Sequence, residues 1–134
     1  MDFCRQNFGS GAPLEEKVGY SRMVKVGPFV SIGGTTSVQP DGSVYGKDAY
    51  EQTAYVLNKQ IALLEQAGSK KEEVIKIKVY TVDPKLGSQI TKAYAELFHD
   101  IRPLCTVIGI SALNRPTQLV EIEMEAVIGA QVAE

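Results

Sequence analysis

The most regular hydrophobic pattern in the chain is an alternation near its C-terminal end. Glu121, Glu123 and Glu125 occupy every second position, and the residues between them are apolar. Period-2 alternation is typical of a β-strand with one face against a core, so a strand is predicted over Leu119–Ile128. Carboxylates about 7 Å apart on its other face repel one another. Either water screens these charges or the protein places a partner opposite them.

Short extended segments also occupy the first part of the chain. Gly27-Pro28 is a turn pair that predicts an antiparallel hairpin, and Gln39-Pro40-Asp41-Gly42 is a second strong turn signal. Phe8–Glu16 lacks periodicity and is expected to form a surface loop. Alternation returns after the middle of the chain. The further predicted strands are Tyr20–Val26, Phe29–Gly33, the short segment Thr35–Val38, Val74–Val82 and Cys105–Ile110.

Two segments have helical periodicity instead. Asp48–Ala67 carries an apolar stripe and is followed by Gly68, which favours a helix end. A second helix is predicted over about Ser88–His99, with Pro103 as a breaker beyond it. The apolar stripes comprise Tyr50, Ala54, Leu57, Ile61 and Leu64 in the first helix and Ile90, Ala93, Tyr94, Leu97 and Phe98 in the second.

The order of these elements predicts an α+β fold, with a single mixed or antiparallel β-sheet and two helices on one of its faces. At 134 residues with 44% hydrophobic content, the chain fits one domain over residues 1–134. Ile75, Ile77 and Val79 are expected to share the face toward the helices. The uncovered face mixes both signs of charge, which suits either solvent or a neighbouring subunit. It carries Lys76, Lys78, Tyr80, Glu121, Glu123 and Glu125.

Composition argues against several classes of function. The net charge is −2 and the basic residues are scattered, so binding to nucleic acid or to an anionic membrane is not expected. The longest uncharged apolar run, Pro103–Asn114, is too short to span a bilayer, and the first residues lack a signal-peptide pattern, so a cytosolic protein is expected. Cys4 and Cys105 are expected to be buried thiols. One histidine, His99, and no clustered cysteines provide no metal-ligand set.

Several segments, taken in their order and spacing, resemble the Rid (reactive intermediate deaminase, YjgF-like) family, which is also labelled endoribonuclease L-PSP. The resemblance implies a chorismate-mutase-like fold and a homotrimer whose sheets close into a central barrel, with a small-molecule cleft at each subunit boundary. It also implies hydrolysis of reactive enamines and imines to a 2-oxo acid and ammonia, without a cofactor. The matching segments are Gly19-Tyr20-Ser21, the strand ending at Gly33, the helix Tyr50–Gly68 with Gln52, Val79–Asp83, Pro103 with the strand of Cys105, and Leu119–Glu123.

The same resemblance implies roles for three residues of the cleft. Glu121 matches a carboxylate that orients or deprotonates the attacking water, a contribution typically worth about 100-fold to 10,000-fold. Tyr20 matches a tyrosine whose hydroxyl bonds substrate or water. Gly33 matches a glycine that lets backbone groups approach a ligand closely. Each residue also has a structural alternative: an interior carboxylate for Glu121, and hairpin packing for Tyr20 and Gly33.

Cys105 is the main departure from the family pattern. It stands where deaminating members carry an arginine that holds the substrate carboxylate, and a neutral thiol cannot replace a bidentate cation. Arg102 is a candidate substitute, although three residues of extended chain shift it by about 10 Å and onto the opposite face. Lys76 and Lys78 are further cations, suited also to pairing with the glutamates. Nucleophilic catalysis by Cys105 is not favoured, because nearby carboxylates raise a thiol pKa.

These residues leave three functions open. The first is a deaminase or related hydrolase of the 2-iminobutanoate/2-iminopropanoate type. The second is a non-catalytic trimer that binds a metabolite or a protein partner, because the arginine is missing while the scaffold is kept. The third is an endoribonuclease or translation inhibitor, against which the absence of a basic stripe argues.

Overall fold

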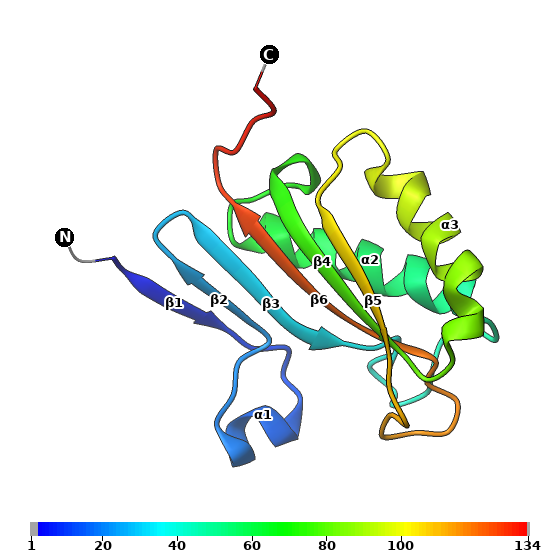
Figure 1. Cartoon of the computed structure of the whole chain (residues 1–134). Coiled ribbons are helices and arrows are strands. Elements are labelled where there is room, and N and C mark those ends of the chain that lie inside the picture. Colours follow the sequence, from blue (N-terminus) through cyan, green and yellow to red (C-terminus); the bar gives the residue numbers. More distant parts are fainter. Residues whose placement is uncertain (1–2, 134) are drawn as a thin grey trace.

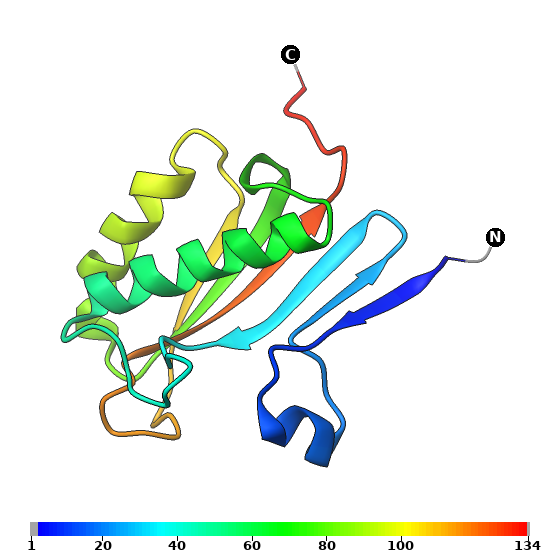
Figure 2. The same cartoon turned by 180° about the vertical axis from the view of Figure 1, so that it is seen from behind.

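A computed structural model describes residues 3–133 of the chain and contains one six-stranded mixed sheet in the order β1-β2-β3-β6-β4-β5. Strands β4 and β5 are parallel and the other neighbouring pairs are antiparallel. The helices α2 and α3 lie behind the sheet in Figure 1 and in front of it in Figure 2. The strands are β1 (Arg5–Phe8), β2 (Met23–Val26), β3 (Phe29–Thr35), β4 (Val74–Thr81), β5 (Leu104–Gly109) and β6 (Val120–Val127), and the helices are α1 (Pro13–Val18), α2 (Ala49–Gln66) and α3 (Gly87–Phe98), with 3₁₀ turns η1 (Lys71–Glu73) and η2 (Pro84–Leu86).

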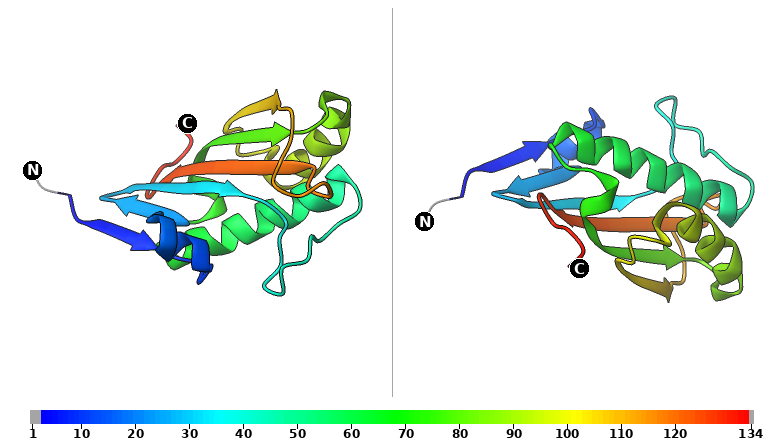
Figure 3. Two further views of the ribbon diagram at one scale, coloured as in Figure 1. Left: turned by 90° about the horizontal axis from the view of Figure 1, so that it is seen from below. Right: turned by 90° about the horizontal axis from the view of Figure 1, so that it is seen from above.

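This architecture confirms the predicted α+β class and the two helices on one face of a single mixed sheet. The end of the sheet that is formed by β1 and β2 extends away from α3 (Figure 3). Helix α2 begins where the side chain of Asp48 accepts a hydrogen bond from the Glu51 N–H at 2.7 Å. It ends before Gly68, whose φ of +86° places it in the left-handed region that glycine adopts without strain.

The core fills the space between the sheet and the two helices. Ile77, Val79, Ile122 and Met124 supply its floor, and Phe98 from α3 is completely buried above them. The predicted stripe of α3 faces the core: Ile90, Ala93 and Phe98 are buried, and Tyr94 and Leu97 are partly buried against it. For α2 the prediction is partly wrong, because the buried face is rotated: Leu57 and Leu64 are buried, whereas Tyr50, Ala54 and Ile61 are only partly so. The buried positions of α2 are Ala49, Gln52, Thr53, Val56, Leu57, Gln60, Leu63 and Leu64.

Two buried glutamines explain this rotation. Gln52 donates to the carbonyls of Thr117 at 2.8 Å and Gly46 at 3.1 Å, and its own carbonyl accepts from the Leu119 N–H at 2.9 Å. Gln60 donates to the Ile122 carbonyl at 2.8 Å. Buried polar groups are tolerated when such bonds replace water. Helix α2 is therefore fastened to the start of β6 by hydrogen bonds as well as by apolar contacts.

Other local predictions fail for identifiable reasons. The segment expected to be a loop contains the start of α1, a six-residue helix that begins at Pro13 without a side-chain cap and ends at Gly19. A register shift between Val74 and Lys76 turns Ile75 outward, and its side chain is 42% exposed. In place of the predicted third strand, β3 continues to Thr35, and Val38 forms only an isolated bridge with Val44.

Replacing Gln52 with leucine keeps the side-chain volume and removes its hydrogen bonds. We expect a loss of about 2–4 kcal/mol in the free energy of unfolding, because three partly buried hydrogen bonds between the buried Gln52 side chain and the backbone are lost. Urea denaturation followed by circular dichroism measures this loss. Gln66→Leu, at an exposed position of the same helix, is the matched control and should change stability little. A Gln52→Leu protein as stable as this control would contradict the proposed role of the hydrogen bonds.

Candidate functional site

The predicted polar face of the sheet is present and is built by β4 and β6. Lys76 lies opposite Glu125, Lys78 opposite Glu123 and Tyr80 opposite Glu121. The Tyr80 hydroxyl donates to the Glu123 carboxylate at 2.8 Å, and this bond is the main reason why the pKa of Tyr80 is raised. The lysines of β4 lie opposite two of the three glutamates of β6, and this opposite charge offsets part of the repulsion among the glutamates.

Glu121 lies against a β-bulge in β3. Ile32 pairs with Met124 and Thr35 with Ile122, so β3 has one residue more than β6 over this interval, and Gly33 and Gly34 occupy the irregular stretch. A Cβ added to Gly34 would overlap the Glu121 carboxylate, with the carboxyl carbon only 3.0 Å away. Glycine at position 34 therefore allows the carboxylate to pack directly on the backbone of β3.

Gly34 was missed by the sequence reasoning, which selected its neighbour Gly33. A Cβ on Gly33 would have its nearest neighbour, the Arg22 carbonyl oxygen, at an ordinary 3.6 Å. The predicted ligand contact of Gly33 stays a prediction. In the sequence Gly34 is marked only by its neighbour Gly33, and a pair of glycines does not show which of the two a side chain approaches.

The Glu121 carboxylate borders a hollow of about 490 Å³ on the open face of the sheet. No hydrogen bond from residues 3–133 reaches this carboxylate, whereas that of Glu123 is held by Tyr80. The hollow beside Glu121 is lined by Gly34, Tyr80, Ile110, Ala112, Leu113, Asn114, Glu121 and Glu123. An accessible carboxylate beside a cavity of this size can accept a proton from a bound water.

Tyr20 lines a different hollow of about 670 Å³, together with Arg22, Thr35 and Lys59. Its side chain is 41% exposed. The two hollows have no lining residue in common, but Gly34, which lines the first, is hydrogen-bonded to Arg22, which lines the second. The carbonyl of Gly34 accepts a hydrogen bond from Arg22 Nη1 at 2.6 Å, while the Glu121 carboxylate packs against the same residue.

Cys105 occupies a third location. It pairs with Ile77, a core residue of β4, so it faces the helix side of β5, opposite to the face of Glu121. Its thiol is accessible, as is that of Cys4, which corrects the expectation that both are buried. Partial burial nevertheless raises the pKa of Cys105, so the thiolate is disfavoured. The direction agrees with the sequence reasoning, but loss of hydration rather than neighbouring carboxylates is the cause.

Arg102 lies in the loop between α3 and β5. Its φ of +59° is in the left-handed region, and its N–H donates to the Phe98 carbonyl at 3.0 Å. It borders a hollow of about 230 Å³ that also includes Leu104 and Glu73. One subunit thus distributes Tyr20, Glu121, Cys105 and Arg102 over separate places, and their roles as site residues stay predictions.

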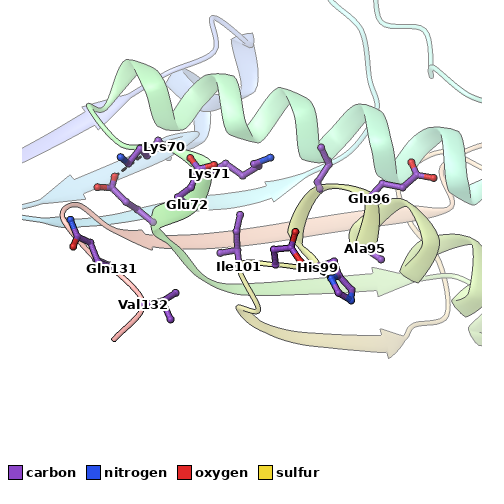
Figure 4. Close-up of a pocket in the computed structure, with 13 residues that line it drawn as sticks. Lys70, Lys71, Glu72, Ala95, Glu96, His99, Ile101, Gln131 and Val132 are labelled. Carbon is purple, nitrogen blue, oxygen red and sulfur yellow. Dashed lines mark hydrogen bonds and ion pairs between the residues drawn. The ribbon is translucent and has the colours of Figure 1, made fainter. Parts of the chain in front are cut away.

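Another hollow, of about 550 Å³, lies between η1, the end of α3 and the C-terminal segment (Figure 4). His99 is at the end of α3 as expected, with Nδ1 2.9 Å from an Asp100 carboxylate oxygen. Glu73 accepts from the N–H of Gly129 at 2.6 Å and from the Ser69 hydroxyl at 2.9 Å. These bonds fasten the chain beyond β6 to η1, so Glu73 has a structural role.

No helix among the described residues is long and apolar enough to cross a membrane. Within residues 3–133, no group of three or more His, Cys, Asp or Glu side chains is arranged to hold a metal ion.

Comparison with known proteins identifies the family. The family described as Endoribonuclease L-PSP matches residues 11–128. An uncharacterized protein of Streptomyces coelicolor is 33% identical over 90% of both chains, and a RutC family protein of Pyrococcus abyssi is 33% identical over 81% of this chain and 84% of its own. The crystal structure of a YjgF/YER057c/UK114 family member from Mycobacterium tuberculosis has a TM-score of 0.84 and 34% identity, covering 93% of this chain and 100% of that one. This chain belongs to the Rid (YjgF-like) family, the family described as endoribonuclease L-PSP.

Proposed function

We propose that the chain forms a cytosolic homotrimer that hydrolyses reactive enamines or imines to 2-oxo acids and ammonia in clefts between subunits, without a cofactor. The observation that supports this activity best is the position of Glu121. Its carboxylate packs on Gly34 at the edge of a hollow and receives no hydrogen bond from residues 3–133, so it is available to a water molecule. The reaction class is the one that the resemblance to the Rid family implies.

The reaction assigned to Glu121 is a proton transfer during addition of water. The water oxygen attacks the imine carbon while the carboxylate accepts one water proton. That proton and the second water hydrogen pass to the nitrogen as the carbon–nitrogen bond breaks. The oxygen remains as the carbonyl of the 2-oxo acid, and the nitrogen leaves as ammonia. An enamine enters the same route after protonation at carbon.

Assembly is supported by the edge strand β5. Leu104 is 68% exposed, and Val107 and Ile108 are each 37% exposed. The outer edge of β5 has no partner strand within the described chain, and an apolar edge strand is a surface that proteins normally cover. A trimer would cover this strand and would let neighbouring subunits combine residues that one subunit keeps apart.

A non-catalytic trimer is the second candidate, and Cys105 is the observation that favours it. A thiol whose pKa is raised cannot act as the carboxylate-binding cation of deaminating relatives. Such a protein would act by binding a metabolite or a protein partner. Calorimetric titration with small carboxylates, amines and nucleobases tests it, and this candidate fails if none of them binds.

Ribonuclease activity, which the family description names, is supported less well. Lys76 and Lys78 lie opposite Glu125 and Glu123, so the positive charges of the open face are interleaved with negative ones. Nucleic-acid binding normally uses a continuous basic surface. Cleavage of single-stranded RNA by stringently purified protein would support ribonuclease activity.

Glu121→Gln should lower the rate of ammonia release from freshly generated 2-iminobutanoate by about 100-fold or more, because the amide cannot accept the proton. Glu125→Gln is the matched control, since Glu125 lies on the same strand and face but outside the hollow. We expect this control to retain at least half of the activity, measured by coupled detection of ammonia. Equal rates for Glu121→Gln and the unchanged protein would remove Glu121 as the base.

Light scattering should give a mass of about three times the 14.6 kDa of one chain. Leu104→Lys should shift the mass toward that of a monomer, because a charged side chain on an edge strand opposes pairing with another chain. Val18→Lys places the same charge at an exposed apolar position of α1 and should leave the mass unchanged. A monomeric unchanged protein would contradict the assembly.

A further inference from the structure

The hollow beside Tyr20 contains two cationic side chains that come from distant parts of the sequence. Arg22 precedes β2 and Lys59 lies in α2, and both line the same space of about 670 Å³. Among residues 3–133, neither forms an ion pair with a carboxylate. In a protein of net charge −2, two adjoining cations without such a partner indicate a preference for an anion.

Arg22 is held in a defined orientation. Its Nη1 donates to the Gly34 carbonyl at 2.6 Å and is 3.4 Å from the Thr35 hydroxyl. Its Nε is buried and has no hydrogen-bond partner among the described residues. The guanidinium is therefore oriented by the bulge of β3 while part of its donor capacity is unused. A planar group fixed in this way is suited to recognising a carboxylate.

Lys59 reaches the same space from the other side. Its Nζ has only a long contact of 3.4 Å with the Val38 carbonyl. Burial, and next the positive charge of Arg22, lower the pKa of Lys59. An anion bound between the two side chains would offset this repulsion and would give Lys59 a closer acceptor than the Val38 carbonyl.

The same hollow is also lined by an acidic residue, Glu15, which lowers its net charge. Its carboxylate accepts from the N–H and hydroxyl of Ser10, at 2.9 and 2.5 Å. Burial alone would raise the pKa of Glu15, but these hydrogen bonds and the charge of Arg22 together lower it, so the group is ionised at neutral pH. Together with Arg22 and Lys59 it leaves one net positive charge, which matches a monoanion better than a phosphate dianion.

The remaining walls suggest an organic ligand. Pro13, Val38 and Pro40 provide apolar surface, and Tyr20 and Tyr55 provide hydroxyl groups. We propose that this hollow binds a small organic monocarboxylate, whose carboxylate is held by Arg22 and Lys59. Such binding does not require hydrolysis and stands apart from the activity assigned to Glu121.

Isothermal titration of the full chain with 2-oxobutanoate tests this site, with inorganic phosphate and butylamine as the other probes. We expect 2-oxobutanoate to bind at millimolar or lower concentration and more tightly than either of them. Arg22→Gln and Lys59→Gln should each weaken its binding about tenfold or more, since each removes a charge-assisted hydrogen bond. Lys17→Gln removes the same charge from the exposed face of α1 and should change the affinity less than about twofold.

Lys59 makes only one long contact, so Lys59→Gln is not expected to disturb folding. Circular dichroism checks the fold of each variant. Glu121→Gln should bind 2-oxobutanoate as tightly as the unchanged protein, because Glu121 lines the other hollow. Failure of the proposed hydrolysis would therefore leave this binding intact, and failure of the binding would leave the hydrolysis intact. The proposed site would be overturned if 2-oxobutanoate did not bind, or if both folded variants bound it as tightly as the unchanged protein does. Tighter binding of phosphate through the same two residues would overturn the choice of a carboxylate.

Discussion

The close packing of the Glu121 carboxylate on Gly34 is the contact on which the rest of the site depends. It exists because β3 carries one extra residue opposite β6 and because position 34 has no side chain. The same residue offers its carbonyl to Arg22. One irregular stretch of strand therefore positions the proposed base on the open sheet face and the proposed carboxylate-binding arginine in the neighbouring hollow.

The buried polar anchors of α2 support this arrangement from the helix side. Gln60 binds the Ile122 carbonyl, next to Glu121, and Gln52 fastens the segment that leads into β6. Lys59 is adjacent to Gln60, so the rotation that buries the two glutamines also directs Lys59 toward the hollow of Arg22. Helix packing, strand register and charge placement are thus parts of one arrangement.

Local patterns in the sequence predict the features that depend on local physics. The alternation over residues 119–128 predicts β6 and its acidic face, and Asp48 and Gly68 predict the limits of α2, because strand period and helix caps are short-range properties. The short α1 and the outward turn of Ile75 have no such signal. Nothing in the local sequence marks Gln52 and Gln60 as buried, because their hydrogen-bond partners lie far along the chain. Arg22 and Lys59 were missed for the same reason: only the topology brings them together.

The most direct test of the account is the rate of imine hydrolysis by Gly34→Ala compared with Gly33→Ala. A methyl group on Gly34 must displace the Glu121 carboxylate, whereas one on Gly33 meets its nearest atom at 3.6 Å. We expect Gly34→Ala to lose most of its activity, by about tenfold or more, while the activity of Gly33→Ala remains close to that of the unchanged protein. Undiminished activity of Gly34→Ala, or an equal loss in both variants, would contradict the role assigned to this contact.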